Sequence, residues 1–465
     1  MEVVFLFSMV VGLLFIGAPI AVSLGLSSII FLLAFSDTSL ASVAQHLYQG
    51  MAAHYTLLAI PFFILASSFM STGGVAVRII RFSIACVGHM RGGLAIAGVF
   101  ACMIFAALSG SSPATVVAIG SIVIAAMTKA GYSKDFAAGV ICNAGTLGIL
   151  IPPSIVMVVY ASAVEVSVGR MFLAGVFPGI LAGLFLMVTI YVMARIKNMP
   201  KGEWQGWGEI FASFSDAFWG LMLIVIIMVG IYGVPGLTGA IFTPTEAAAV
   251  ASVYAFLVAS FVYRDMGPLA AGANGGTRSS LLQKPWVLAS AFWHRDTRKT
   301  LLEAGKLTIM LMFIIANALV LKAVLTEQQI PQQIAEAMLS AGFGKIMFLV
   351  MVNVVLLIGG QFMEPSGLLV IVAPLVFPIA LELGVDPIHL GIIMVVNMEI
   401  GMITPPVGLN LFVTSGVAGM PMMRVVRAAL PFLAVLFVFL ILVTYVPIIS
   451  TWLPTKMMGP EIIMK

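Results

Sequence analysis

Charged residues are what this sequence has least of. Asp, Glu, Lys and Arg together make up 9% of the 465 residues, whereas 62% are hydrophobic and the mean hydropathy is +1.16. A soluble domain of this length needs a much more polar surface. The composition therefore excludes a soluble globular protein, and we expect the chain to reside in a lipid bilayer with no nucleic-acid partner.

Cysteine and histidine are also scarce. The three cysteines, Cys86, Cys102 and Cys142, lie in apolar stretches without the spacing of a disulfide or a metal site. The five histidines show neither a His-Glu-x-x-His motif nor a pair four residues apart. Neither a nucleophile with its base nor a set of metal ligands is recognisable, so we predict that the protein is not an enzyme and has no cofactor.

Long apolar runs take the place of the missing polar surface. Many reach the roughly 20 residues that a helix needs to cross a bilayer, and helices satisfy their own backbone in lipid. Residues 3–35 form a run too long for one crossing, and Gly17-Ala18-Pro19 divides it into two. Because Met1-Glu2-Val3-Val4 has no basic residue, we expect retained spans here instead of a signal peptide. The sequence therefore predicts an all-α polytopic membrane protein.

Connections between the predicted spans have their own composition. A polar segment with His46 and His54 follows the first two spans. Trp204, Trp207 and Trp219 mark an amphipathic stretch that suits the membrane interface, ahead of a span predicted at 218–233.

A polar segment broken by glycine and proline occurs twice in the apolar chain. In the first copy, Ser109-Gly110-Ser111-Ser112-Pro113 joins two apolar arms, 93–107 and 114–128, that we interpret as a re-entrant hairpin. In the second copy, Gln361 to Gly367 forms the corresponding tip. Each hairpin is followed by a span that Gly and Pro interrupt, at Gly145 to Pro153 and at Gly401 to Pro406. Pro113 and Pro152 are 39 positions apart, and Pro365 and Pro405 are 40 apart, so the two copies have nearly the same spacing.

Lys and Arg are distributed unevenly between the predicted connections. If each hairpin returns to its own side, all but five of the 22 basic residues fall on one face, which the positive-inside rule makes cytoplasmic. The first hairpin then enters from the cytoplasm and the second from the opposite side, with both chain ends outside. The two copies are therefore predicted to be inverted repeats. The five exceptions are Arg170, Lys322, Lys345, Lys456 and Lys465.

These features divide the chain into scaffold helices and two transport repeats, each made of a hairpin and a broken helix. The predicted segments are an N-terminal scaffold with an interfacial connector (1–92), the first transport repeat (93–165), scaffold helices (166–263), a cytoplasmic linker (264–300), a scaffold helix with a second connector (301–343), the second transport repeat (344–420), and a C-terminal scaffold helix with its tail (421–465).

Inverted repeats with broken helices near the midplane are typical of secondary transporters. Each break exposes amide donors for an anion and carbonyl acceptors for a cation. The hydroxyl and carbonyl oxygens suit Na⁺ better than a transition metal. Glu364 and Glu399 are acidic at membrane depth, where a charge is costly and often functional. A structural role stays open for Glu399 and Glu246, and small residues in such helices also serve close packing.

Three stretches resemble a known family: Leu147 to Pro153, Gln361 to Ser366, and Asn397 to Asn410. They look like the large membrane subunit of the tripartite ATP-independent periplasmic (TRAP) transporters, and the resemblance covers essentially the whole chain. The Met-Glu-Pro-Ser and Asn-Met-Glu-Ile-Gly strings are similar to the DctM-type C4-dicarboxylate branch, although many relatives carry Asp at the Glu364 position. The resemblance implies Na⁺-coupled import of succinate, fumarate or malate across the bacterial inner membrane by an elevator mechanism. The implied partners are a small DctQ-type membrane subunit and a DctP-type periplasmic solute-binding protein.

The resemblance also implies where the ligands bind. Na⁺ would lie where each hairpin tip meets the break of its own repeat, and the substrate between the two tips. The implied sodium positions are Ser109, Ser111, Ser112, Gly145 and Thr146 in the first repeat, and Glu364, Ser366, Gly401 and Thr404 in the second. The implied substrate positions are Ser112, Pro113, Asn143, Pro153, Pro365, Asn397 and Pro406.

Other functions stay open on the sequence. A channel also uses broken helices, but it does not need two hairpins that enter from opposite sides. A stand-alone sodium-dicarboxylate symporter of related design, or a TRAP permease for another organic anion, would share these features. Uptake measured with and without a binding protein separates these transporters.

Overall fold

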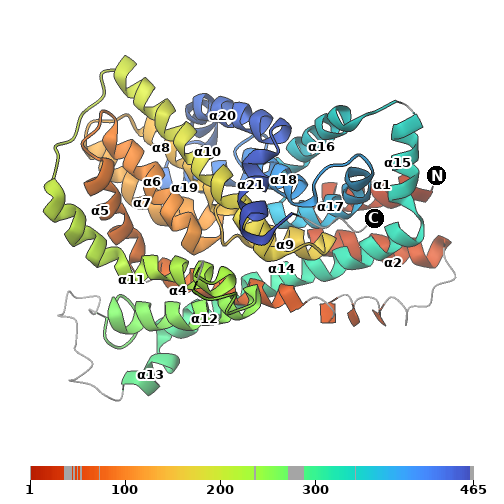
Figure 1. The fold of residues 1–465 in the computed structure, drawn as a ribbon, viewed down its shortest axis with the longest axis horizontal. Helices are drawn as coiled ribbons and strands as arrows, with labels where there is room; N and C mark the ends of the chain where they lie inside the picture. Colours follow the sequence, from red (N-terminus) through yellow and green to blue (C-terminus); the bar gives the residue numbers. More distant parts are fainter. Residues whose placement is uncertain are drawn as a thin grey trace.

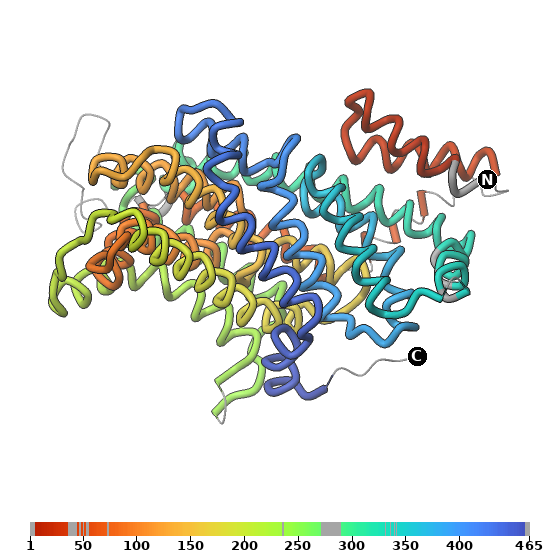
Figure 2. Tube along the Cα trace, turned by 90° about the horizontal axis from the view of Figure 1, so that it is seen from above, coloured from red at the N-terminus to blue at the C-terminus, as the bar shows by residue number. Residues whose placement is uncertain are grey.

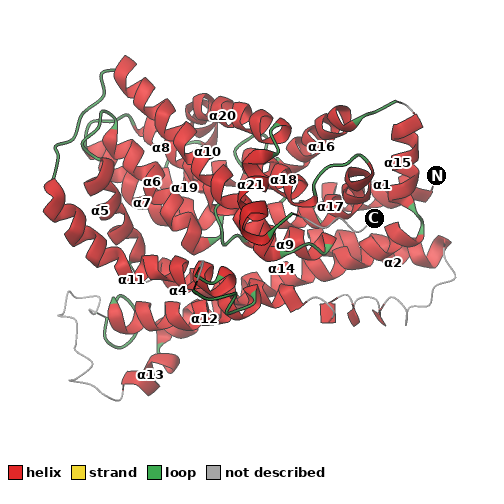
Figure 3. Ribbon diagram, viewed as in Figure 1, coloured by secondary structure: helices red, strands yellow, loops and turns green. Residues whose placement is uncertain are grey.

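The structure, a computed structural model, describes residues 2–35, 44–45, 48–49, 51–52, 55–72, 74–234, 237–270, 287–340 and 342–460. His46, His54, residues 271–286 of the predicted linker and Lys465 lie outside these residues. Within the described residues all regular structure is helical (Figure 3). Seven of these helices are long and apolar enough to cross a membrane, and the bent pair on either side of residue 73 gives an eighth if it counts as one span. The predicted all-α polytopic membrane protein is thus confirmed.

The N-terminal run forms two helices, as predicted. The first, α1, spans Glu2–Phe15 and the second, α2, spans Ile20–Phe35. Gly17 between them has a φ of +86°, a conformation that glycine adopts without strain. The next elements are η1 (Tyr55–Leu58), α4 (Ala59–Thr72) and α5 (Val75–Val87).

Both predicted hairpins are present as pairs of packed helices. The first consists of α6 (Gly93–Ser109) and α7 (Ser112–Lys129), and the second of α16 (Lys345–Gly360) and α17 (Pro365–Glu382). Proline lies in the first turn of α7 and α17, where its missing N–H costs no intrahelical hydrogen bond. Both second arms reach 18 residues and can span a membrane by length and composition. Helix α7 is therefore longer than the arm predicted at 114–128.

Both predicted helix breaks are also present. After the first hairpin the chain forms α8 (Lys134–Ala144), the short η2 (Gly145–Ile149) and α9 (Ile155–Val164). After the second hairpin it forms α18 (Pro387–Gly401) and α19 (Leu409–Ala418). The interruptions therefore begin at the predicted glycines, Gly145 and Gly401, because the glycine and proline pattern that ends a helix is local in sequence.

The two hairpins lie at opposite ends of the molecule. Figure 1 shows α6 and α7 beside α5 at one end, and α16 and α17 at the other. Between them run α8 to α9 and α18 to α19, and the long α14 (Arg295–Glu327) extends beneath both. This arrangement supports the predicted inverted relation of the repeats, which stays a prediction.

Helices α10 (Val168–Ile196), α20 (Met422–Tyr445) and α21 (Ile448–Met458) pack against the broken helices and, through α10, against α6 of the first hairpin. Helix α10 contacts α6, α9, α18, α20 and α21, and α20 contacts α8, α18 and α19. Figure 2 shows α10 and α20 passing side by side over this group. The sequence-based division placed them with the scaffold in 166–263 and 421–465, whereas the packing groups them with the transport repeats.

A second group forms around α4. It contains α11 (Gly206–Tyr232), α12 (Pro244–Leu257) and α14, and α12 continues into the π-helical η3 (Val258–Val262). Helix α4 packs against α12 and α14, and α11 packs against α5 and α12. The short α13 (Val287–Trp293) leads into α14, and α15 (Ile330–Ser340) follows it. The prediction of a separate tryptophan-rich stretch before a span at 218–233 is wrong, because one continuous helix, α11, contains both Trp207 and Trp219.

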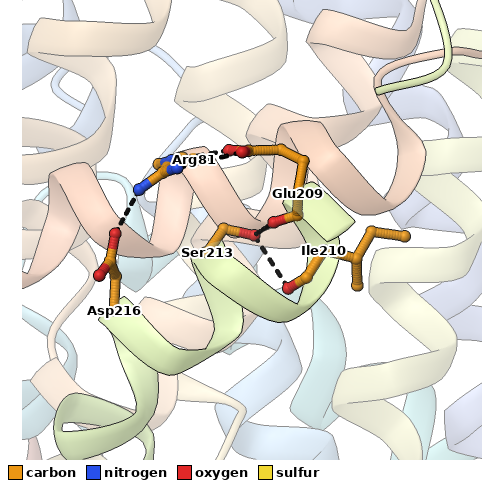
Figure 4. A network of polar contacts seen from close by, with 5 residues as sticks. All are labelled: Arg81, Glu209, Ile210, Ser213 and Asp216. Atoms are coloured by element: carbon orange, nitrogen blue, oxygen red, sulfur yellow. Dashed lines mark hydrogen bonds and ion pairs between the residues drawn. The ribbon is translucent and has the colours of Figure 1, made fainter. Parts of the chain in front are cut away.

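Ion pairs attach α5 to α11 outside the apolar core. The Arg81 guanidinium donates to Glu209 Oε1 at 2.7 Å and also binds Asp216, about two turns further along α11 (Figure 4). Ser213 lies between them and donates to the Glu209 carbonyl at 2.7 Å. Exposed pairs of this kind each stabilise by only about 0–1 kcal/mol, so their effect is to orient α5.

The structure gives a local reason for most exceptions to the basic-residue rule. Three of the five donate to carbonyl oxygens at or just past helix ends, where the helix dipole favours a cation. A fourth lies over an aromatic ring, and Lys465 is outside the described residues. The contacts are Arg170 Nη1 to Gly459 O at 2.8 Å, Lys322 Nζ to Ala163 O at 3.0 Å, Lys345 Nζ to Gly384 O at 3.0 Å, and Lys456 Nζ at 5.1 Å from the Trp452 ring centre.

We expect cysteines at the outer ends of the two hairpins to be labelled from opposite sides of the membrane. Lys129 ends α7 and Glu382 ends α17, and both are exposed. In a variant without Cys86, Cys102 and Cys142, an impermeant maleimide should modify Lys129→Cys from the cytoplasm and Glu382→Cys from the periplasm. Labelling of both positions from one side would contradict the inverted topology.

Candidate functional site

The tip of the first hairpin lies directly against the break of its own repeat. A Cβ on Gly148 would come within 2.6 Å of the Ser111 carbonyl oxygen, and one on Gly110 within 2.8 Å of the Pro153 carbonyl oxygen. Gly110 also has a φ of +57°, so both the space and the backbone require glycine there. The first hairpin tip therefore contacts residues 145–153, as predicted, and we call this contact region the first junction.

Hydroxyl groups at this first junction bond to one another and to the backbone. Ser109 Oγ lies 2.9 Å from Thr115 Oγ1 and 3.2 Å from the Ser111 carbonyl oxygen. Thr115 Oγ1 donates to the same carbonyl at 2.9 Å. Sequence reasoning missed Thr115, although its position one helical turn after Ser111 was the available signal. The junction thus concentrates hydroxyl and carbonyl oxygens, the ligand type that suits an alkali cation.

The second junction, where the tip of the second hairpin meets the break of its own repeat, also contains hydroxyl and carbonyl oxygens, but their hydrogen bonds differ. Glu364 is the N-cap of α17: its Oε2 accepts from the Gly367 backbone N–H at 3.0 Å, and its Oε1 accepts from Ser366 Oγ at 3.0 Å. The Gly408 backbone N–H donates to the Gln361 carbonyl at 3.0 Å, which joins the second break to its hairpin tip.

Two predicted sodium positions of the second repeat lie at its break: Gly401 ends α18, and Thr404 lies in the break itself. A Cβ on Gly401 would come within 2.7 Å of Gly360 Cα, so glycine is required at this crossing of α18 and α16. Thr404 is half-buried, and its Oγ1 donates to the Ile400 carbonyl at 2.8 Å. Sequence reasoning missed Gly360 and Gly408, which have no polar side chain to reveal them.

Thr146, a predicted sodium position, lies where the two repeats meet. Its hydroxyl is 2.7 Å from both the Asn143 carbonyl and Glu399 Oε1, and both side chains are fully buried. Gly145 beside it is buried against Val116. The sequence left both a functional and a structural role open for Glu399. In the structure its carboxylate, which belongs to α18 of the second repeat, contacts Thr146 in the break of the first repeat.

One cavity of about 530 Å³ lies between the two hairpin tips. The first tip lines it from Ser109 to Ala114, and the second from Glu364 to Ser366. The opposite wall comes from outside the repeats, where sequence reasoning had no motif to follow: Ser67, Ser68 and Ser71 of α4, and Glu303, Leu307, Met310 and Leu311 of α14.

The cavity brings together some predicted positions and leaves others elsewhere. Asn143 donates its amide to the Gly139 and Ala429 carbonyls, and Asn397 donates to the Ile393 carbonyl and to Asn353 Oδ1. The Nδ2 atom of each asparagine is thus bonded to a neighbouring helix, and neither side chain lines the cavity. On the cavity lie Ser109, Ser111, Ser112, Pro113, Glu364, Pro365 and Ser366; away from its lining lie Asn143, Gly145, Thr146, Pro153, Asn397, Gly401, Thr404 and Pro406.

The cavity has no basic lining. Among the described residues that line it there is no Lys or Arg, and the acidic ones are Glu303 and Glu364. Lys299 lies 3.9 Å from Glu303 one turn away on α14 but is not part of the wall. Two helix N-termini, those of α7 and α17, begin at the cavity and present backbone N–H groups and about half a positive charge each. The site can thus orient an anion but cannot neutralise a dianion with its own side chains.

The oxygen atoms at the two junctions are hard ligands of the kind that suits an alkali cation. They come from serine and threonine hydroxyls, backbone carbonyls and the carboxylates of Glu364 and Glu399. Within the described ranges no three His, Cys, Asp or Glu side chains cluster as a transition-metal site would need.

Comparison with known proteins gives consistent matches over nearly the whole chain. Residues 7–449 match the family described as the tripartite ATP-independent periplasmic transporter, DctM component. The chain is 70% identical over 463 residues to the C4-dicarboxylate TRAP transporter large permease protein DctM of Vibrio cholerae, covering 100% of both chains. It is 60% identical to the protein of the same name in Pseudomonas aeruginosa, covering 93% of both.

Among solved structures, the fold is similar to that of the YdaH transporter of Alcanivorax borkumensis. The TM-score is 0.60 at 13% identity, covering 88% of this chain and 89% of that one. At this identity the likeness concerns the fold alone.

Proposed function

The chain belongs to the DctM component family of the tripartite ATP-independent periplasmic transporters, and we propose that it is the large permease subunit through which such a transporter imports C4-dicarboxylates such as succinate, fumarate and malate. The family consists of transporters and not enzymes, and its members are multi-pass proteins of the inner membrane. Relatives with 70% and 60% identity are named as C4-dicarboxylate permeases, which favours this substrate class.

The observation that carries the proposal is the cavity shared by the two hairpin tips. Two helix N-termini point into it, its polar groups are mainly hydroxyls, and its described lining contains no basic side chain. A small dianion held here needs cations bound with it, since an uncompensated ion in such surroundings costs several kcal/mol. The two hairpin–break junctions supply oxygen ligands on either side, which is why we assign Na⁺ as the coupling ion.

The packing supports an elevator mechanism. The hairpins, the broken helices, α10 and α20 form one group, and α4, α11, α12 and α14 form another. The cavity lies between these groups along the half of α14 that is nearer α13, which the predicted topology places on the cytoplasmic side. We infer that this conformation faces the cytoplasm and that the first group slides along the second to face the periplasm.

The proposed partners follow from the family. A large permease of this kind works with a small DctQ-type membrane subunit and a DctP-type periplasmic solute-binding protein. Reconstitution in liposomes with and without these subunits, under an imposed inward Na⁺ gradient, tests the function. We expect saturable succinate uptake only with Na⁺ and the binding protein. Uptake without the binding protein favours a stand-alone symporter, and uptake of another organic anion but no dicarboxylate favours a permease of different specificity.

Glu364→Gln is expected to raise the half-saturating Na⁺ concentration for uptake about tenfold, equivalent to roughly 1.4 kcal/mol of ion binding. The amide oxygen can still accept from the Gly367 N–H and keep the α17 cap, but it offers a cation no carboxylate. Glu303→Gln is the matched control, because Glu303 lines the same cavity but lies on α14, where Lys299 is 3.9 Å away, and belongs to neither hairpin nor helix break. Equal Na⁺ affinity in both variants would remove Glu364 from the proposed cation site.

A further inference from the structure

Asn410 is fully buried in the first turn of α19 and bonds to three separate segments. Its Nδ2 donates to Ser112 Oγ at 2.6 Å, at the tip of the first hairpin, and reaches the Cys142 carbonyl at 3.5 Å. Its backbone N–H donates to the Met402 carbonyl at 2.9 Å, across the second break. A single residue therefore fixes the second break to the first hairpin.

Glu399 makes a comparable link from the other side of the second break. It lies two residues before the end of α18, and its Oε1 accepts from the Thr146 hydroxyl at 2.7 Å. Thr146 belongs to η2, the first segment of the first break. The Glu399 side chain is fully buried, and its Oε2 has no hydrogen-bond partner within the described part of the chain.

These two residues flank the second break and bind the first junction at two different points. The break occupies residues 402–408, between α18 and α19. If a cation at the second junction takes ligands from both this segment and the tip at Glu364, its binding changes the distance between them. Any such displacement changes the positions of Glu399 and Asn410, and through them those of Thr146 and Ser112. Buried hydrogen bonds transmit such shifts because their loss leaves an unpaired polar group.

We propose that Glu399 and Asn410 are positioning residues that couple the two cation sites, so that occupation of one raises the affinity of the other. The inference rests on the proposed function, since it needs one Na⁺ at each junction. Thermodynamic linkage makes the effect reciprocal: what the second site does for the first, the first does for the second. Neither residue lines the cavity, so neither is assigned to the substrate.

The experiment measures the Na⁺ dependence of succinate uptake by the complete three-component transporter in proteoliposomes. Glu399→Leu and Asn410→Ala each remove one link, and we expect the Hill coefficient to fall from near two to near one, with half-saturating Na⁺ rising about fivefold. Glu399→Gln keeps an acceptor oxygen for Thr146 and is expected to behave as the unmodified protein does.

His389→Gln is the control for general damage to α18. His389 is buried on the same helix, but its ring bonds to Ser450 Oγ at 2.7 Å and to the Thr444 carbonyl at 3.2 Å, which tie α18 to α20 and α21. We expect this variant to lose thermal stability in detergent while keeping the Hill coefficient.

The outcomes separate the inference from the function on which it rests. If Glu399→Gln is as impaired as Glu399→Leu, the carboxylate itself serves a cation and the positioning role is wrong. If Glu399→Leu and Asn410→Ala keep the Hill coefficient of a Na⁺-dependent parent protein, the coupling is wrong and the function stands. If the parent protein shows no Na⁺ dependence at all, the proposed function fails.

Discussion

A covalent link between residues 165 and 322 is expected to abolish transport, and its cleavage to restore it. Lys322 of α14 reaches across to the C-terminal end of α9, where its Nζ lies 3.0 Å from Glu165 Oε1 and 3.0 Å from the Ala163 carbonyl oxygen. The two helices belong to the two groups that slide past each other in the proposed elevator mechanism. A link that cannot extend would therefore hold the protein in one conformation.

The same region has a second contact between the groups. Thr56 of η1 and Ser162 of α9 have their hydroxyl oxygens 2.9 Å apart. Along α14, Lys322 lies about 28 Å beyond Glu303, at 1.5 Å per residue, so these contacts close the end of the molecule opposite the cavity wall. The proposed mechanism therefore requires these contacts to break when the cavity opens to that side.

The link is made with cysteines at Glu165 and Lys322 and a cleavable bifunctional maleimide, in a background without native cysteines. The ion pair is partly exposed and contributes about 0–1 kcal/mol, so the unlinked double variant should transport nearly as well as its parent. The control is the same reagent at Arg81 and Glu209, which are bonded to each other within the predicted scaffold (Figure 4). Undiminished uptake through a fully linked 165–322 pair would rule out the sliding motion.

Two or more Na⁺ are expected to enter with each C4-dicarboxylate, because the bound dianion needs compensation that the protein does not provide. The described cavity lining has no Lys or Arg, and its acidic residues, Glu303 and Glu364, add negative charge. The N-termini of α7 and α17 contribute only about half a charge each. The rest must come from cations that bind with the substrate, one at each junction.

Parallel measurement of ²²Na⁺ and labelled succinate in proteoliposomes gives the ratio directly. With two Na⁺ per dianion, transport is electroneutral and insensitive to membrane potential; a third makes it electrogenic and adds roughly 2.3 kcal/mol per 100 mV. Removal of Na⁺ should reduce uptake to background in either case. A ratio near one would mean that protons or an unassigned basic group neutralise the substrate, and the two-site arrangement would have to be abandoned.

Local sequence pattern predicted the elements well. The two hairpin tips, the breaks beginning at Gly145 and Gly401, and the division of the first run at Gly17 all appear where the residues indicated. Each is a property of a few adjacent residues: glycine permits an unusual φ, proline removes a donor, and an apolar run of sufficient length forms a helix in lipid. Where one apolar pattern continued into another, as in α11, the predicted boundary was wrong.

The repeat pattern did not predict which residues line the cavity. Asn143 and Asn397 correspond in the repeat pattern and were both assigned to the substrate, yet each donates its amide to packing contacts. Whether a buried amide faces a cavity or a neighbouring helix depends on what lies across from it, which no local pattern contains. For the same reason the Thr146–Glu399 contact, between residues 253 positions apart, was not foreseen.

Hydropathy and backbone conformation are set within a few turns of chain, so the residues alone predicted an α-helical membrane protein with two broken, polar units. The shared cavity of the two hairpin tips, its other wall on α4 and α14, and the links that Asn410 and Glu399 make between the repeats emerged from the packing of the helices. Such contacts join residues hundreds of positions apart, and they depend on which helix faces meet when the apolar surfaces are packed together.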